Sequence, residues 1–136
     1  MQDPTLDITY EQTRPFIPPI KEGKVIKVYD GDTITIAAVL FDTAYRFPVR
    51  LFGIDCPELK GSSPEEKQRA IKARDDLSEM VLGKMVRLEN VTTEKYGRLL
   101  AEVYLGDINL STWMLEKKHA YPYFGGTKSK ALKDTF

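Results

Sequence analysis

Three β-strand patterns come before a well-marked helix in this sequence, and two more strand patterns come after it. Residues 24–29 are rich in β-branched and aromatic side chains, which is typical of a strand. An Asp-Gly-Asp turn at residues 30–32 separates them from a second strand that begins at residues 33–36. After another turn near residues 42–43, a third strand is predicted over residues 47–54. Three consecutive strands with short turns predict an antiparallel meander at the start of the fold.

The first helix has a clear start and a clear stop. Ser63 can cap its N-terminus, Pro64 suits the first helical position, and Glu66 lies where a capping box needs an acid. Gly83 is suited to end the helix. Apolar residues recur between these signals at helical spacing, namely Ala70, Ala73, Leu77, Met80 and Val81. The pattern predicts a helix with one apolar stripe.

Two further strands are predicted at residues 85–91 and 99–105, and a second helix runs from Asn109 to about Lys118. A meander, a helix and two more strands are the layout of a small Greek-key barrel called the OB-fold. We therefore expect a mainly β protein of the α+β class: a five-stranded OB-fold Greek-key barrel with two to three helices.

A chain of 136 residues fits one domain with a single core. Residues 1–20 contain four prolines without periodicity, so they are predicted to form an extended N-terminal arm, with the domain at 21–136. No apolar run is long enough to cross a bilayer, and the N-terminus does not resemble a signal peptide. Cys56 is the only cysteine, which suits a reducing compartment. We expect an intracellular, cytoplasmic protein, or a secreted one if a signal was removed.

The net charge is zero, so any contact with nucleic acid must be local. The Asp-Gly-Asp tripeptide alone indicates a turn far more often than a metal site. Arg50 lies in an otherwise apolar strand, where it must reach solvent or meet an anion; a salt bridge explains it about as well as a ligand. Asp32, Asp55 and Glu58 fall at strand ends, which the barrel can bring together beside Arg50 and Arg98. These five side chains form the strongest candidate site.

Carboxylates of this kind favour Ca²⁺ or Mg²⁺ when neither a histidine cluster nor paired cysteines are present. The single histidine, His119, gives little basis for a zinc site or a Ser-His-Asp triad. Cys56 without a clear histidine partner is better explained as a packed residue than as a nucleophile. A carboxylate can take a proton from water while planar guanidinium groups hold phosphoryl oxygens. The residue types therefore suit hydrolysis of a phosphodiester.

Three separated segments resemble the successive signatures of the staphylococcal nuclease (thermonuclease) family. They are Val28-Tyr29-Asp30-Gly31-Asp32-Thr33, Val49-Arg50-Leu51-Phe52-Gly53-Ile54-Asp55-Cys56-Pro57-Glu58 and Lys95-Tyr96-Gly97-Arg98-Leu99-Leu100-Ala101. They occur in the family's order, with a helix between the second and the third, and the resemblance covers roughly residues 24–120. It implies that residues 21–136 are a nuclease domain of this family.

The resemblance also implies roles for individual residues. It implies Asp32, Asp55 and the backbone carbonyl of Cys56 as ligands of one calcium ion. Glu58 is implied as the general base, with Arg50 and Arg98 as the clamp on the phosphate, so that the implied catalytic set is Arg50, Glu58 and Arg98. The implied contacts to nucleic acid are Lys95, Tyr96, Tyr121 and Tyr123.

The implied activity is that of a calcium-dependent endonuclease acting on DNA and RNA with little sequence specificity, leaving 3′-phosphate and 5′-hydroxyl ends. We expect a monomer without membrane contact. The main alternative is a non-catalytic module of the same fold that binds nucleic acid or protein. A plain single-strand-binding OB domain would instead need a basic groove with exposed aromatic side chains. The presence of all three carboxylates and both arginines favours the nuclease.

Overall fold

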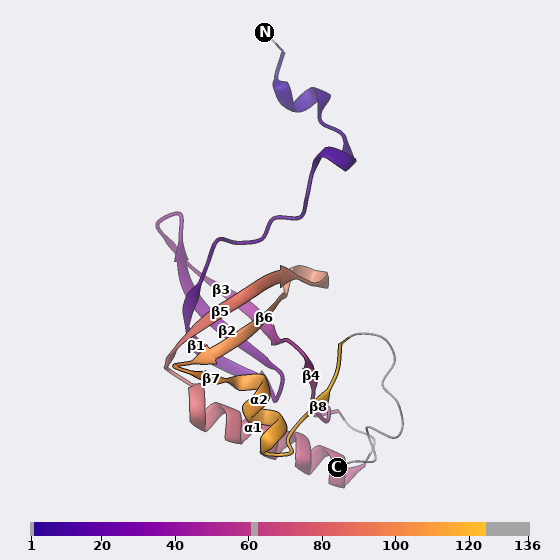
Figure 1. The fold of residues 1–136 in the computed structure, drawn as a ribbon, viewed down its shortest axis with the longest axis vertical. Coiled ribbons are helices and arrows are strands. Elements are labelled where there is room, and N and C mark those ends of the chain that lie inside the picture. Colours follow the sequence, from indigo (N-terminus) through magenta and orange to yellow (C-terminus); the bar gives the residue numbers. More distant parts are fainter. Residues whose placement is uncertain (1, 61–62, 125–136) are drawn as a thin grey trace.

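The structure is a computed structural model that describes residues 2–60 and 63–124. Figure 1 shows a curved, barrel-like sheet with one long helix lying across one end and a shorter helix beside it. The strands are β1 (Glu22–Asp30), β2 (Thr33–Leu40), β3 (Thr43–Leu51), β4 (Ile54–Asp55), β5 (Met85–Thr93), β6 (Leu99–Leu105), β7 (Ile108–Asn109) and β8 (Tyr121–Pro122). The helices are α1 (Pro64–Val81), α2 (Leu110–Glu116) and three short 3₁₀ helices, Pro4–Asp7, Tyr10–Gln12 and Lys95–Gly97.

Within the described residues, five strands close into a barrel. β1 pairs antiparallel with both β2 and β5, β2 pairs with β3, and β5 pairs with β6. A parallel pairing of β3 with β6 joins the two ends of the sheet. Closure leaves no long free edge among these strands. The predicted fold class, a five-stranded barrel with helices, is confirmed.

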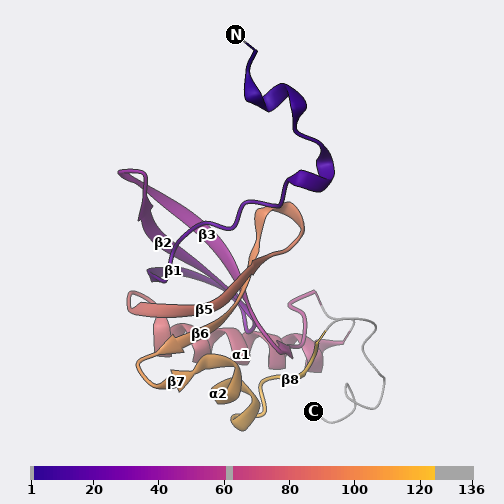
Figure 2. The same ribbon diagram turned by 45° about the horizontal axis from the view of Figure 1, so that its top comes forward.

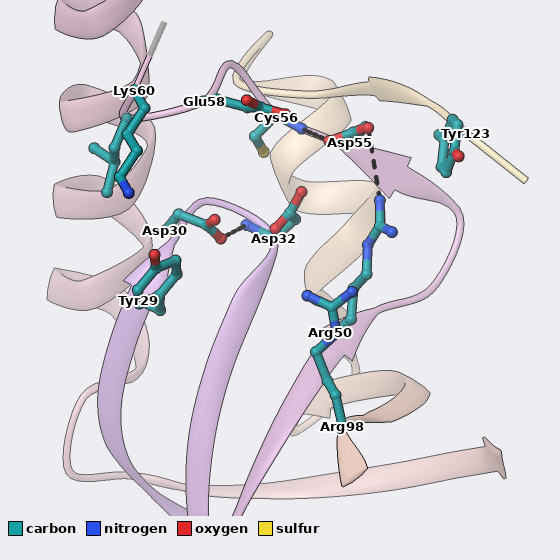
Figure 3. A pocket seen from close by; sticks show the side chains of 11 residues that line it. Tyr29, Asp30, Asp32, Arg50, Asp55, Cys56, Glu58, Lys60, Arg98 and Tyr123 are labelled. Atoms are coloured by element: carbon teal, nitrogen blue, oxygen red, sulfur yellow. Dashed lines mark hydrogen bonds and ion pairs between the residues drawn. The ribbon is translucent and has the colours of Figure 1, made fainter. Parts of the chain in front are cut away.

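The third strand lies earlier in the chain than the predicted 47–54. β3 begins at Thr43 and ends at Leu51, and Gly53 then adopts a positive φ of 88° before β4 begins. The sequence pattern hid this break because the apolar run continues through Ile54, which is buried in β4. The break turns the chain so that Asp55 points toward the end of the barrel that carries the predicted site (Figure 3).

Helix α1 starts where its capping signals predict. The Ser63 side chain accepts a hydrogen bond from the backbone N–H of Glu66 at 3.0 Å, and Pro64 takes the first position. The buried stripe packs the helix against the barrel; it consists of Ala70, Ala73, Leu77 and Val81. Gly83 follows the helix with a φ of 83°, which explains the stop.

The interior of the barrel is filled by aliphatic side chains from all five barrel strands and from both α-helices. Side chains on alternate positions of the strands point inward, as period-two patterning requires. The largest fully buried side chains are Val25, Ile34, Ile36, Val49, Leu51, Ile54, Leu77, Val81, Val86, Leu99, Leu110 and Met114. This core fixes the positions of the strand ends, where the polar residues of the predicted site lie.

Residues 2–19 extend away from the barrel (Figures 1 and 2). They are extended apart from the 3₁₀ turns Pro4–Asp7 and Tyr10–Gln12, and none of them is buried. Ile20 is the first buried residue, at the point where the chain enters β1. Across the described ranges, no helix combines the length and apolar character needed to cross a bilayer.

Candidate active site

Two buried carboxyl groups form the floor of the site. Asp32 lies in the turn before β2 and Asp55 lies in β4, and both are largely excluded from solvent. Asp32 accepts a hydrogen bond from the Thr33 hydroxyl at 3.0 Å, and Asp55 accepts one from the backbone N–H of Cys56 at 2.9 Å. The antiparallel pairing of β2 with β3, in which Thr33 lies opposite Arg50, thus brings together two acids that are 23 positions apart in the sequence.

Burial raises the pKa of Asp32 to about 6. A hydrogen bond and the negative charge of Asp30 contribute to this rise, whereas a hydrogen bond to Asp55 and the positive charge of Arg50 oppose it. The cause is desolvation, because a carboxylate loses its hydration when it is buried. The floor of the site is therefore a place where positive charge would be favourable.

The turn between β1 and β2 needs glycine for space. Asp30 accepts a hydrogen bond from the Asp32 backbone N–H at 3.0 Å, which is the local bond of an Asx turn. A Cβ atom on Gly31 would lie 2.8 Å from the sulfur of Cys56 and 3.0 Å from the Cβ of Ala73 on α1. The Asp-Gly-Asp tripeptide is therefore both a tight turn and part of the floor.

One side of the site, which we call the arginine wall, consists of Arg50, Arg98 and Tyr123. Arg50 Nη2 lies 3.6 Å from Asp55 Oδ2 and donates to the carbonyl of Ile54 at 3.3 Å. Its guanidinium carbon is 5.1 Å from the centre of the Tyr123 ring. The salt-bridge explanation of Arg50 is correct, and the same side chain also lines the cleft.

The two arginines share a carboxylate that sequence reasoning did not identify. Arg98 donates through Nε and Nη2 to Glu94 Oε2, at 2.8 and 2.7 Å, and Arg50 Nη1 lies 4.0 Å from Glu94 Oε1. The sequence did contain a signal, because Glu94 precedes Arg98 by four positions, a spacing typical of ion pairs. Glu94 lies at the point where both guanidinium groups converge.

These side chains line an open cleft of about 420 Å³ (Figure 3). Its lining residues are Tyr29, Asp30, Asp32, Arg50, Asp55, Cys56, Glu58, Leu59, Lys60, Arg98 and Tyr123. The structure therefore brings together every residue predicted as catalytic or metal-binding. Glu58 lies on the exposed side of the cleft, where solvent reaches it.

The residues predicted to contact nucleic acid do not all line the cleft. Lys95 borders a neighbouring hollow of about 660 Å³ together with Tyr123. Tyr121 is buried in β8, opposite Asp55, and is not among the side chains that line the cleft. The side chain of Tyr96 lies outside the described part of the structure. A base contact by Tyr121 or Tyr96 stays a prediction.

In residues 2–60 and 63–124, no three side chains of His, Cys, Asp or Glu form a group able to hold a metal ion. The predicted set is of a different kind, because it combines two carboxylates with a main-chain carbonyl, that of Cys56. Cys56 is itself buried, and its sulfur packs against the Gly31 turn.

The sequence profile of the family described as "Staphylococcal nuclease homologue" matches residues 48–135, which is more than half of the chain. The chain belongs to the staphylococcal nuclease family. The matched residues include Arg50, Asp55, Glu58 and Arg98, whereas Asp32 lies before them. The predicted family membership is thereby confirmed.

Several proteins to which the chain is similar are named nucleases. The chain is 31% identical to an uncharacterized endonuclease of Escherichia coli over 102 residues, covering 74% of this chain and 60% of that protein. It is 33% identical to an uncharacterized endonuclease of Haemophilus influenzae, covering 74% and 51%. It is 35% identical to the staphylococcal-like nuclease CAN1 of Arabidopsis thaliana, covering 65% and 26%. The chain thus spans 60% or less of these three relatives.

Proposed function

We propose that this chain is a calcium-dependent endonuclease that hydrolyses phosphodiester bonds in DNA and RNA with little sequence specificity. The observation that carries the proposal is the convergence of two buried carboxylates, an exposed glutamate and two arginines on one cleft (Figure 3). The names of the relatives, endonuclease and staphylococcal-like nuclease, support the same activity.

The donor atoms on the floor fit a hard divalent cation. Asp32 and Asp55 supply carboxylate oxygens, the carbonyl of Cys56 supplies a third oxygen, and calcium prefers oxygen ligands. The raised pKa of Asp32 supports a cation here, since its charge would offset the cost of burying the carboxylate. When bound, calcium would supply positive charge against the phosphodiester.

The arginine wall would hold the phosphate. Arg50 and Arg98 carry planar guanidinium groups that can donate two parallel hydrogen bonds to phosphoryl oxygens. Arg98 Nη2 and Arg50 Nη1 lie 2.7 and 4.0 Å from the carboxylate oxygens of Glu94, which supports a joint hold on one anion. A phosphate that replaces Glu94 as their partner would receive their charge as negative charge builds in the transition state.

Glu58 would act as the general base. It lies on the solvent side of the cleft, where a water molecule can approach the phosphorus. Glu58 takes the proton as the water oxygen forms a bond to phosphorus and the bond to the 5′ oxygen breaks. The 5′ oxygen takes a proton from a solvent water molecule in the open cleft and leaves as a hydroxyl, and the phosphate stays on the 3′ side.

Cleavage of plasmid DNA, heat-denatured DNA and RNA in calcium, in magnesium and in chelator tests the proposal. Calcium-dependent cleavage with 3′-phosphate ends is expected, and Glu58→Ala should lower kcat by about a hundredfold or more without loss of folding. Glu79→Ala, which changes an exposed glutamate on α1, is the matched control and should cleave normally. No cleavage by folded protein in any metal would favour the non-catalytic binding module instead.

A further inference from the structure

The cleft has a second wall to which no role has been given. Tyr29 and Lys60, which we call the tyrosine–lysine wall, lie on the other side of the two floor carboxylates from the arginine wall (Figure 3). Tyr29 is at the end of β1, and Lys60 is on the loop that follows Glu58. Both line the same cleft as the proposed catalytic residues.

A bulge in β1 accounts for the position of Tyr29. Val28 pairs with Ile34 and Asp30 pairs with Thr33, so Tyr29 is the extra residue between two neighbouring pairs. An extra residue changes the direction in which side chains leave a strand, and such bulges are frequent beside active sites. Tyr29 is 55% exposed, so solvent reaches this side chain at the border of the cleft.

Neither side chain of this wall is committed to a polar or ring contact in the described part of the chain. No hydrogen bond, ion pair or ring contact is made by the Tyr29 or Lys60 side chain there. An exposed aromatic ring and a lysine that line one cleft are groups suited to bind a base and a phosphate of an unpaired strand. Asp30, the acid that follows Tyr29 in the sequence, already accepts a hydrogen bond from the backbone N–H of Asp32.

A polymer substrate extends on both sides of the bond that is cut. Each phosphodiester in a strand has a nucleoside on both sides of its phosphorus. If the arginine wall receives the phosphate and the nucleoside on one side, the tyrosine–lysine wall is the opposite lining of the cleft, against which the other nucleoside would lie. This step rests on the proposed nuclease function.

We propose that Tyr29 and Lys60 form a nucleotide subsite for single-stranded nucleic acid. The base stacks on the Tyr29 ring, and Lys60 contacts the next phosphate. Stacking needs an unpaired base, so the subsite favours denatured DNA and RNA over duplex DNA.

The test compares kcat and KM of the wild type, Tyr29→Ala, Tyr29→Phe and Lys60→Gln on single-stranded and duplex DNA in calcium. Tyr29→Ala should raise KM for single-stranded DNA about fivefold or more and leave kcat nearly unchanged. The preference of the enzyme for single-stranded over duplex DNA should therefore decrease. Tyr29→Phe keeps the ring and should behave as wild type. Lys60→Gln should raise KM and reduce the slope of log affinity against log salt by about 0.7.

Matched controls are Tyr45→Ala, a tyrosine of similar exposure (46%) on β3, and Lys84→Ala, an exposed lysine after α1. Neither should change KM. Fluorescence anisotropy of a labelled single strand in a Glu58→Gln background reads the subsite without turnover. If Tyr29→Ala binds the single strand with the affinity and KM of the wild type, the subsite proposal is wrong, although the proposed nuclease function could still be correct. Absent cleavage in the wild type would count against the nuclease alone, because binding would still report on Tyr29.

Discussion

The charge on Asp32 is expected to destabilise the folded protein when no cation is bound. Burial raises the pKa of this carboxyl from 3.8 to about 6, so the folded state holds its proton more tightly than the unfolded state. Wild-type stability should therefore fall as the pH rises through this window. At pH 7 in chelator, Asp32→Asn should be more stable by about 2 to 3 kcal/mol, because amide and carboxylate have nearly the same shape.

Urea denaturation from pH 3.5 to 8 measures this difference, which should shrink toward the acid end. Asp107→Asn, at an exposed position, is the control and should leave the curve unchanged. Calcium should raise the stability of the wild type and leave Asp32→Asn unaffected, because only a carboxylate there can bind the ion strongly. Equal stability of the wild type and Asp32→Asn at every pH would contradict the conclusion that burial raises the pKa of Asp32.

The pairing of Glu94 with two arginines predicts competition with the phosphate. Glu94→Gln keeps the shape of the side chain and removes the charge, so both guanidinium groups should become more available. The dissociation constant for a deoxynucleoside monophosphate in calcium should fall about fivefold, measured by calorimetry.

Glu89→Gln provides the comparison for Glu94→Gln. Glu89 forms an ion pair of 2.9 Å with Arg87 on the barrel surface, outside the cleft. Its substitution should leave nucleotide affinity unchanged. Weaker binding by Glu94→Gln would show instead that Glu94 holds the arginines in the geometry that the phosphate needs.

At the scale of elements, the approach of the β1–β2 turn to α1 predicts the effect of Gly31→Ala. The added methyl group would lie 2.8 Å from the Cys56 sulfur, so the turn or the following loop must move. Overpacking of this kind costs about 1 to 3 kcal/mol, which urea denaturation can measure. The double variant Gly31→Ala, Cys56→Ala should recover part of the loss, since it removes the sulfur. Strict additivity of the two substitutions would rule out this contact as the cause.

The elements were predictable where their signals are local. The Ser63 cap and the Gly83 stop lie within a few residues of the ends of α1, so the sequence alone was sufficient. The end of β3 was not predictable, because Ile54 continues the apolar run beyond the turn at Gly53.

The residues of the site also divide into those that the sequence predicts and those that only the folded structure identifies. Three motifs occur in the same order as in a known family, and this order was enough to select the arginines and carboxylates as the candidate site. Composition alone was not enough. The convergence of Arg50 and Arg98 on Glu94 depends on the parallel pairing of β3 with β6, which no local pattern shows. The position of Tyr29 depends in the same way on a bulge that exists only in the paired strands.

For the whole molecule, the division between arm and barrel predicts that the arm adds nothing to the stability of the barrel. No residue from 2 to 19 is buried, whereas Ile20 is part of the core and the carbonyl of Lys21 accepts the N–H of Leu88. Deletion of residues 2–17 should therefore leave the melting temperature within about 2 °C of the wild type, by calorimetry. Ile20→Ala truncates the first buried side chain and should cost about 2 to 4 kcal/mol. A deletion as damaging as Ile20→Ala would place the boundary of the folding unit inside the arm. Unchanged cleavage by the deleted protein would also show that both walls of the cleft are complete without the arm.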